Sequence, residues 1–238
     1  FDYFDAASND CGFPDPEYYE LFKRAVHHPR AHVIAYTAFE HVWSRSKGVG
    51  TGSAVIKPIG LRLASDVPSL VPSSVDRATT VFVPPYHNDN RLLDLAGRCN
   101  DLGIKAFTGR YGGHQDLVGF KAVVHIPYAW SNLALFEHLQ DQLPVMVPSR
   151  RFLFELKTTG DFWWQQGHLL RQYVKLSEWY CSENDFLVYF GSWADLRRKL
   201  DRLDLDLLRR RMKDRAQSHA TAVLGAWHEV FAKIEAAK

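Results

Sequence analysis

Short apolar runs alternate with stretches of helical periodicity between residues 80 and 147 of this chain. Four of the apolar runs are expected to form strands: 80–83, 104–108, 122–126 and 145–147. Because these runs are mostly apolar, strands made from them must be buried on both faces, which is typical of parallel sheets. The alternation therefore predicts an α/β fold, with a Rossmann-like parallel sheet that carries helices on both faces.

Capping residues indicate where the helices between these strands begin and end. Asn88 or Asp89 can cap a helix that ends at Gly103, where a glycine suits the left-handed turn after a helix. A second helix is expected over 133–141. The last stretch, 207–238, carries its apolar residues on a single stripe and is expected to be one long helix.

The first 60 residues contain a smaller set of the same elements. Thr37 and Glu40 have the spacing of a capping box for a helix over 38–47. Two β-type runs flank that helix, 32–36 and 54–56. The chain begins at Phe1 without a methionine, so we expect that a longer protein was cut here or that its start is missing.

The strand at 122–126 leads into a helix start with polar capping residues, Ser131 and Asn132. In an open parallel sheet, ligands bind beyond the carboxyl ends of the strands, where free amides and the positive end of a helix dipole can hold an anion. A diphosphate would suit this place. Glu137 lies about one and a half turns into the helix and could accept hydrogen bonds from a ribose.

The string PYAWSNLALFEHLQDQLPVMVPS, residues 127–149, resembles the donor-binding segment of GT-B glycosyltransferases. In that family a Pro-Ser pair and a variable stretch precede a helix that reads Leu-Glu-Ala-Met-Ala-x-Gly-x-Pro-Val-Val-Ala. The resemblance implies that Glu137 binds the nucleotide ribose. It extends over roughly residues 80 to 235, because DFLVYFGSWADLRRKL and AWHEVF are similar to later segments of the family. Ala129 stands where retaining members have a first glutamate, so the reaction could retain or invert configuration.

The resemblance also implies a division of the chain into parts. Residues 1–60 would be the tail of an N-terminal Rossmann-like acceptor domain, 61–78 a linker, 79–206 the C-terminal donor-binding Rossmann-like domain, and 207–238 a C-terminal helix that packs across the domains. The expected fold is therefore of GT-B type with an incomplete N-terminal domain. The catalytic residues stay unknown, because an acceptor domain would supply the base.

Two loops at strand ends contain further candidate residues. After the second strand, a glycine permits close backbone approach and the neighbouring side chains could stack on or bond to a base; these residues are Gly109, Arg110 and Tyr111. An ordinary connecting loop is the alternative. After the first strand, contacts to sugar or phosphate could come from Tyr86, His87 and Asn88. A lone histidine beside a helix cap is more often structural.

Composition argues against several other classes of protein. With 29 basic and 27 acidic residues the formal net charge is only +2, so no nucleic acid is expected as a partner. Cys11, Cys99 and Cys181 are too few and too far apart for a disulfide framework, and no metal site is expected. The apolar runs are too short to span a membrane. These features predict a cytoplasmic protein.

The resemblance implies a glycosyltransferase that moves a hexose or pentose from a nucleoside-diphosphate sugar to a glycan or other acceptor, with no cofactor besides that donor. One alternative is a non-catalytic nucleotide-sugar-binding module derived from such an enzyme. Another is an NAD-dependent sugar-modifying enzyme, which is disfavoured because GVGTG at 48–52 precedes a strand and opens no helix. A preceding part of the protein could contact a membrane peripherally.

Overall fold

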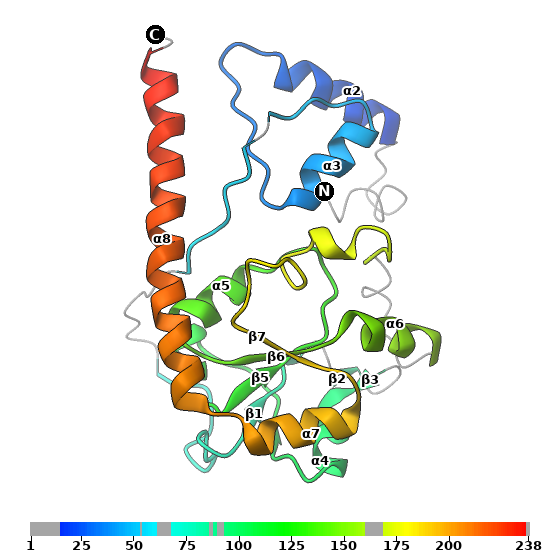
Figure 1. Ribbon diagram of the computed structural model, residues 1–238, viewed down its shortest axis with the longest axis vertical. Helices are drawn as coiled ribbons and strands as arrows, with labels where there is room; N and C mark the ends of the chain where they lie inside the picture. The colour runs from blue at the N-terminus through cyan, green and yellow to red at the C-terminus, as the bar shows by residue number, and fades with distance from the viewer. Residues whose placement is uncertain are drawn as a thin grey trace.

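The computed structural model describes residues 15–52, 54–60, 68–85, 88–89, 93–159 and 169–236. Its main feature is a sheet of five parallel strands with helices on both faces (Figure 1). The strands are β1 (Val81–Phe82), β4 (Ala106–Phe107), β5 (Ala122–Val124), β6 (Val145–Pro148) and β7 (Leu187–Phe190). This arrangement confirms the predicted α/β, Rossmann-like fold.

The two faces of the sheet are buried in two separate cores, because side chains alternate along each strand. Val81 and Val83 enter one core, and Phe82 enters the other. The first core includes side chains from α4 (Leu95–Asp101), α6 (Arg150–Thr159) and α7 (Trp193–Arg202). The second includes side chains from α5 (Leu133–Gln140) and α8 (Leu205–Ala236). Both faces are therefore covered by helices, which explains why the strands have no polar face.

The strand order β4-β1-β5-β6-β7 contains a topological switch point. The chain goes from β1 to one neighbour, β4, and then returns to form β5 on the other side of β1. In doubly wound sheets the crevice beyond the carboxyl ends of the strands at such a reversal is the usual ligand site. The segment that leads from β5 into α5 lies at this position.

We call residues 15–56 the N-terminal unit. It contains α2 (Asp15–Val26) and α3 (Ala38–Ser46), and α3 begins with the predicted capping box of Thr37 and Glu40. The β-type runs that flank α3 meet at a single parallel bridge, between Ala35 and Val55. The helix was thus predicted correctly, whereas the two flanking runs form one isolated bridge and no strand.

The largest local difference from prediction concerns the start of α4. Asn88 and Asp89 do not cap this helix; they form β2 (Asn88–Asp89), which pairs antiparallel with β3 (Leu93–Asp94). Asp94 is the cap instead, because its carboxylate accepts a hydrogen bond from the Gly97 N–H at 2.8 Å. Gly103 follows the helix with φ +69°, as predicted. Two 3₁₀ helices complete the described elements: η2 (His114–Leu117) precedes β5, and η4 (Val174–Leu176) precedes β7.

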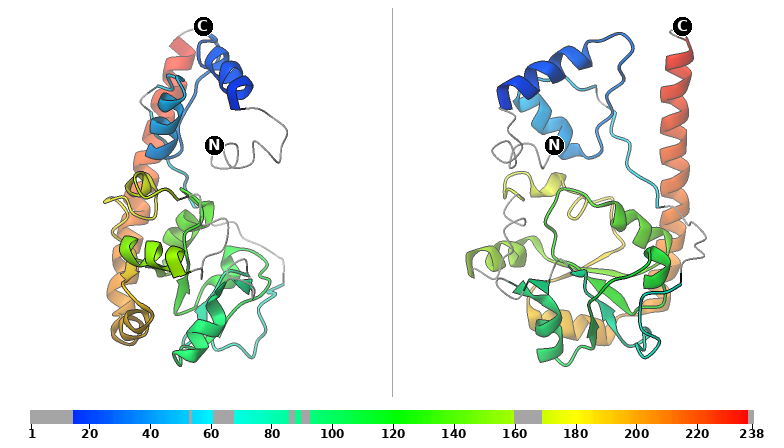
Figure 2. Two further views of the ribbon diagram at one scale, coloured as in Figure 1. Left: turned by 90° about the vertical axis from the view of Figure 1, so that its right-hand side faces the viewer. Right: turned by 180° about the vertical axis from the view of Figure 1, so that it is seen from behind.

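The long helix α8 runs past the sheet, and its C-terminal end lies level with the N-terminal unit (Figures 1 and 2). Its first turns bury Leu208, Met212 and Ala216 in the second core. Further along, Leu224 and Phe231 are exposed. Packing of this helix across two domains stays a prediction. Within the described residues, neither α8 nor any other helix combines the length and the apolar character needed to cross a membrane.

Candidate functional site

The start of α5 lies beyond the carboxyl end of β5, as the sequence predicted. Asn132 is the N-cap, because its Oδ1 accepts a hydrogen bond from the Ala134 N–H at 2.9 Å. Its Nδ2 donates to the Tyr128 hydroxyl at 3.2 Å, so the cap side chain is held from both ends. The neighbouring Ser131 hydroxyl is buried and makes no hydrogen bond of normal geometry with the described residues.

The backbone before this helix start is fixed by contacts with a later loop. The Trp179 indole N–H donates to the Ala129 carbonyl at 2.9 Å, and the Glu178 N–H donates to the Trp130 carbonyl at 2.9 Å. The Trp179 ring also stacks on His125, which follows β5, with ring centroids 4.3 Å apart. The segment from β5 to α5 is therefore held rigidly by buried aromatic side chains.

The N-terminal unit docks against the same segment. The Phe39 ring lies parallel to the Trp130 ring, with centroids 3.6 Å apart and an interplanar angle of 9°. Both side chains are buried, and Tyr173 meets Phe39 edge to face at 5.8 Å. Since Trp130 directly precedes Ser131, this stack places the N-terminal unit beside the start of α5.

The negative charge of Glu137 contributes to the raised pKa values of two tyrosines. Burial is the main cause that raises the pKa of Tyr111, and the Glu137 carboxylate raises it further. Burial likewise raises the pKa of Tyr36 to about 12, where the nearby Ser131 hydroxyl acts in the opposite direction and carboxylates that include Glu137 add to the rise. Glu137 is thus near Tyr111 from the loop after β4 and Tyr36 from the N-terminal unit.

The three predicted residues of the loop after β4 have different surroundings. A side chain at Gly109 would meet the Phe107 ring at 3.0 Å, so a glycine fits closely here. Arg110 is exposed. Tyr111 is 37% exposed and packs edge to face on Phe82, with centroids 5.3 Å apart. The structure therefore brings Tyr111 toward Glu137, while the exposed Arg110 is free to reach a ligand.

The predicted contacts after β1 cannot be placed in the same way. Tyr86 and His87 lie outside the described residues, and Asn88 is described only by its backbone in β2. Their part in a sugar or phosphate site stays a prediction.

A buried ion pair beside the site was not predicted from the sequence. Lys57 Nζ lies 3.0 Å from Glu178 Oε2 and 2.7 Å from Glu183 Oε2. Burial alone would lower the pKa of Lys57, but these carboxylates outweigh it and the pKa is raised. Glu178 is only 2% exposed and also accepts a hydrogen bond from Asn184 Nδ2 at 3.0 Å. The network attaches the segment after the N-terminal unit to the loop that holds Trp130.

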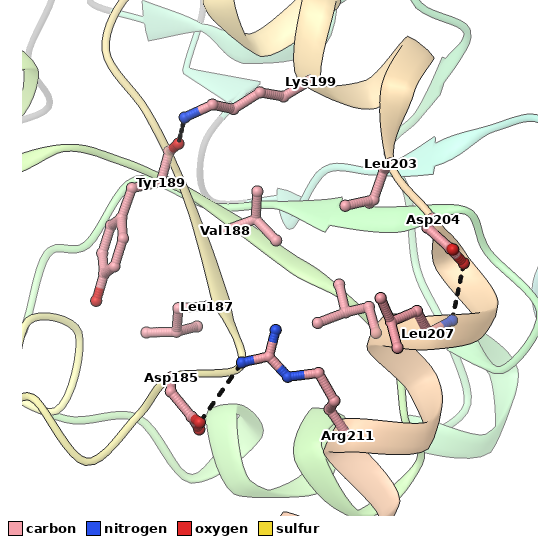
Figure 3. A pocket seen from close by; sticks show the side chains of 10 residues that line it. Asp185, Leu187, Val188, Tyr189, Lys199, Leu203, Asp204, Leu207 and Arg211 are labelled. Carbon is pink, nitrogen blue, oxygen red and sulfur yellow. Dashed lines mark hydrogen bonds and ion pairs between the residues drawn. The ribbon is translucent and has the colours of Figure 1, made fainter.

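A cavity of about 390 Å³ lies beside β7, apart from the start of α5 (Figure 3). It lies along the last strand of the sheet, between α7 and α8. Lys199 Nζ donates to the Tyr189 carbonyl, and Arg211 pairs with Asp185 at 3.7 Å. A lysine that covers a carbonyl of an edge strand is a common protection against pairing with other chains. We therefore interpret this cavity as part of a protected sheet edge.

Comparisons of the chain with models of protein families, with curated proteins and with solved structures gave no match. Among the described residues, no three His, Cys, Asp or Glu side chains are grouped so as to hold a metal ion. The chemistry of the site must therefore be inferred from the residues around the start of α5.

Proposed function

We propose that this chain is the donor-binding part of a nucleotide-sugar-dependent glycosyltransferase of GT-B type. The observation that carries the proposal is the capped start of α5, which lies beyond the carboxyl end of β5 at the switch point of the sheet. This is the position where doubly wound sheets bind their ligands. It also coincides with the segment whose sequence resembles the donor-binding segment of that family.

In this proposal the first turn of α5 holds the diphosphate. The Ala134 and Leu135 N–H groups already donate to Asn132, so negative charge would be favoured there chiefly by the helix dipole. The dipole would also stabilise the nucleoside diphosphate as it leaves the sugar, when negative charge develops on the bridging oxygen. Leu133, the first helical residue, is 59% exposed, so a ligand can approach this end of the helix.

Glu137 would bind the ribose, because a carboxylate must stay away from phosphate oxygens of the same charge. It is four residues beyond Leu133, which corresponds to a rise of about 6 Å along the helix. That spacing separates the carboxylate from the anion at the helix start. Glu137 is only partly buried, so its oxygens could accept hydrogen bonds from a ribose diol. Tyr111 and Arg110 would then contact the base.

A thermal-shift panel tests the proposal. The wild-type chain is mixed with UDP, GDP, ADP, CMP, the corresponding nucleotide sugars and NAD, and the panel is repeated on Glu137→Ala. A ligand that binds the folded state raises the unfolding midpoint by mass action. The matched control is Glu229→Ala, which removes an exposed glutamate on α8, far along the chain from the site.

We expect one nucleoside diphosphate and its sugar to stabilise the wild type and the control but stabilise Glu137→Ala less. Stabilisation by NAD alone, or by no nucleotide, would refute the proposal. Sugar release from the bound donor, measured with and without added acceptors, then separates an enzyme from a module that only binds the donor.

A further inference from the structure

A buried carboxylate on the 3₁₀ helix η2 holds the loop that follows β4, residues 109–113. Asp116 is only 5% exposed, and its Oδ2 accepts a hydrogen bond from the Gly112 N–H at 2.7 Å. The Asp116 N–H in turn donates to the Gly113 carbonyl at 3.0 Å. Asp116 is thus bonded to the end of this loop through both its side chain and its backbone.

The same carboxylate oxygen joins the loop to a distant part of the chain. The N–H of Leu70, which is 46 positions away in sequence, donates to Asp116 Oδ2 at 2.8 Å. The next residue, Val71, is 4% exposed and packs in the second core, so the backbone at Leu70 is itself fixed. Two N–H groups from separate segments therefore meet on one oxygen atom, and removal of that atom would leave both without this acceptor.

The surroundings of Asp116 favour its ionised form. Burial alone would raise the pKa of this carboxyl, but hydrogen bonds from the Ser69 side chain and from the two backbone N–H groups, with the charge of Arg77, outweigh burial and the pKa is lowered. Hydrogen bonds to an ionised acceptor are stronger than those between neutral groups. Asp116 is therefore a firm attachment for the loop at neutral pH.

This attachment lies next to the two side chains proposed to contact the base. Tyr111 directly precedes Gly112, and its ring packs edge to face on Phe82. Tyr111 is partly exposed and Arg110 is exposed, so a ligand can reach both. An apolar ring contact has little directional preference, whereas the hydrogen bond from Gly112 to Asp116 fixes the backbone that carries both side chains.

The helix η2 also relates this loop to α5. His114 Nδ1 lies 2.5 Å from Asp141 Oδ2 at the end of α5. Glu137, the residue proposed to bind the ribose, lies about one turn before Asp141, whose N–H donates to the Glu137 carbonyl at 2.9 Å. The short helix therefore connects the loop that would contact the base with the helix that would bind the ribose.

We infer that Asp116 is the positioning residue that determines which base the proposed donor site selects, because it holds the backbone of the loop after β4 to η2 and to Leu70. This inference rests on the proposed function. Asp116 itself does not contact the ligand; it sets the direction in which Arg110 and Tyr111 present their side chains. Selection of a base depends on that direction, whereas attraction of a diphosphate to the start of α5 does not.

Calorimetric titration with UDP, GDP, ADP and inorganic pyrophosphate tests the inference on the wild type, Asp116→Ala and Asp116→Asn. The deciding quantity is the ratio of the dissociation constants of the weakest and the tightest diphosphate. Ordering the backbone of one freed residue on binding costs enough free energy to weaken an affinity about tenfold. We expect Asp116→Ala to weaken the tightest diphosphate by this factor and the other diphosphates and pyrophosphate much less, so that the ratio falls. Asp116→Asn keeps an oxygen that can accept both N–H groups, so its ratio should lie between those of Asp116→Ala and the wild type.

Asp195→Ala is the matched control. Asp195 Oδ2 accepts a hydrogen bond from the Gly191 N–H at 2.8 Å, with the same spacing of four residues as Asp116 and Gly112. It lies at the start of α7, directly after β7, and three strands separate β7 from β4 in the sheet. This variant should unfold at a lower temperature but keep the wild-type ratio. An equal fall of the ratio in the control would show a general loss of structure and would overturn the role of Asp116.

Hydrogen exchange tests the attachment without a ligand. In Asp116→Ala the amides of Gly112 and Leu70 should exchange about tenfold faster than in the wild type, while those of β5 stay protected. Unchanged exchange at both amides would overturn the inference. Should Asp116→Ala fail to fold, Asp116→Asn gives the answer through the same two measurements, with smaller changes in the same direction.

The outcomes also separate this inference from the proposed function. If the wild type binds none of the three diphosphates, both fail. If the wild type binds all three equally well, or if the ratio in Asp116→Ala equals that of the wild type, only the inference about Asp116 fails.

Discussion

The buried imidazole of His138 should make the folded state sensitive to acid. His138 lies on α5 next to Glu137 but points into the protein, where it is 7% exposed. Burial is the main cause that lowers its pKa to about 4, and the charge of His114 adds to this. His114 itself lies on η2, and its Nδ1 is 2.5 Å from Asp141 Oδ2 at the end of α5. Protonation of His138 would therefore add a positive charge close to the contact between His114 and Asp141.

The sign and size of the effect follow from the two pKa values. In the unfolded chain a histidine titrates near 6.5, so between about pH 6.5 and pH 4 the unfolded state binds one more proton than the folded state. Stability is thus lost as the pH falls through this range. With a folded-state pKa of about 4, the loss amounts to about 2 kcal/mol at pH 5 and about 3 kcal/mol at pH 4.

Urea unfolding at pH 7, 6, 5 and 4 measures this dependence. His138→Leu removes the titrating group, and His228→Gln, at an exposed position on α8, is the control. The pKa of His219 is also lowered, chiefly by burial, so some acid sensitivity should persist in every variant. We expect the wild type and the control to lose about 2 kcal/mol more than His138→Leu between pH 7 and pH 5. Identical slopes for wild type and His138→Leu would refute the reasoning.

Three further substitutions test packing beside the site and at the edge of the sheet. Gly60→Ala should destabilise the fold by more than about 2 kcal/mol, because a Cβ there would lie 2.2 Å from the Phe136 carbonyl oxygen. Gly50→Ala is the control: a Cβ at Gly50 would have open space, so this variant should be nearly neutral in the same urea titration. Phe39→Ala should cost about 3 to 4 kcal/mol through loss of its buried ring, and an unchanged midpoint would contradict the stack on Trp130. Lys199→Ala should uncover the Tyr189 carbonyl at the edge of β7, and size-exclusion chromatography over a range of concentrations should then show self-association that the wild type lacks.

The parts of this structure that local patterns can encode were predicted from the sequence. Alternating apolar runs predicted the parallel strands, because each strand contributes side chains to two cores. Capping signals located α3 and α5 to within a residue or two. The start of α4 was misplaced, since Asn88 and Asp89 suit a helix cap as well as a strand, and only their pairing with Leu93 and Asp94 decides between the two.

The residues around the site that the sequence did not reveal are brought together by long-range contacts. Lys57 and Glu178 are more than a hundred positions apart, and neither belongs to a motif. Tyr36 precedes a helix cap and has no periodic relation to α5. Only the folded chain brings Lys57 and Glu178 together, because their contact depends on how the N-terminal unit docks.

That docking is defined at two separate places. At one place Phe39 stacks on Trp130. At the other, the segment 57–60 is attached by the Lys57 ion pair and by a 2.7 Å hydrogen bond between His219 and the Pro58 carbonyl, and Gly60 packs against the backbone of α5. The N-terminal unit and the segment that follows it are thus held at two points some twenty residues apart, so they cannot rotate about either point alone.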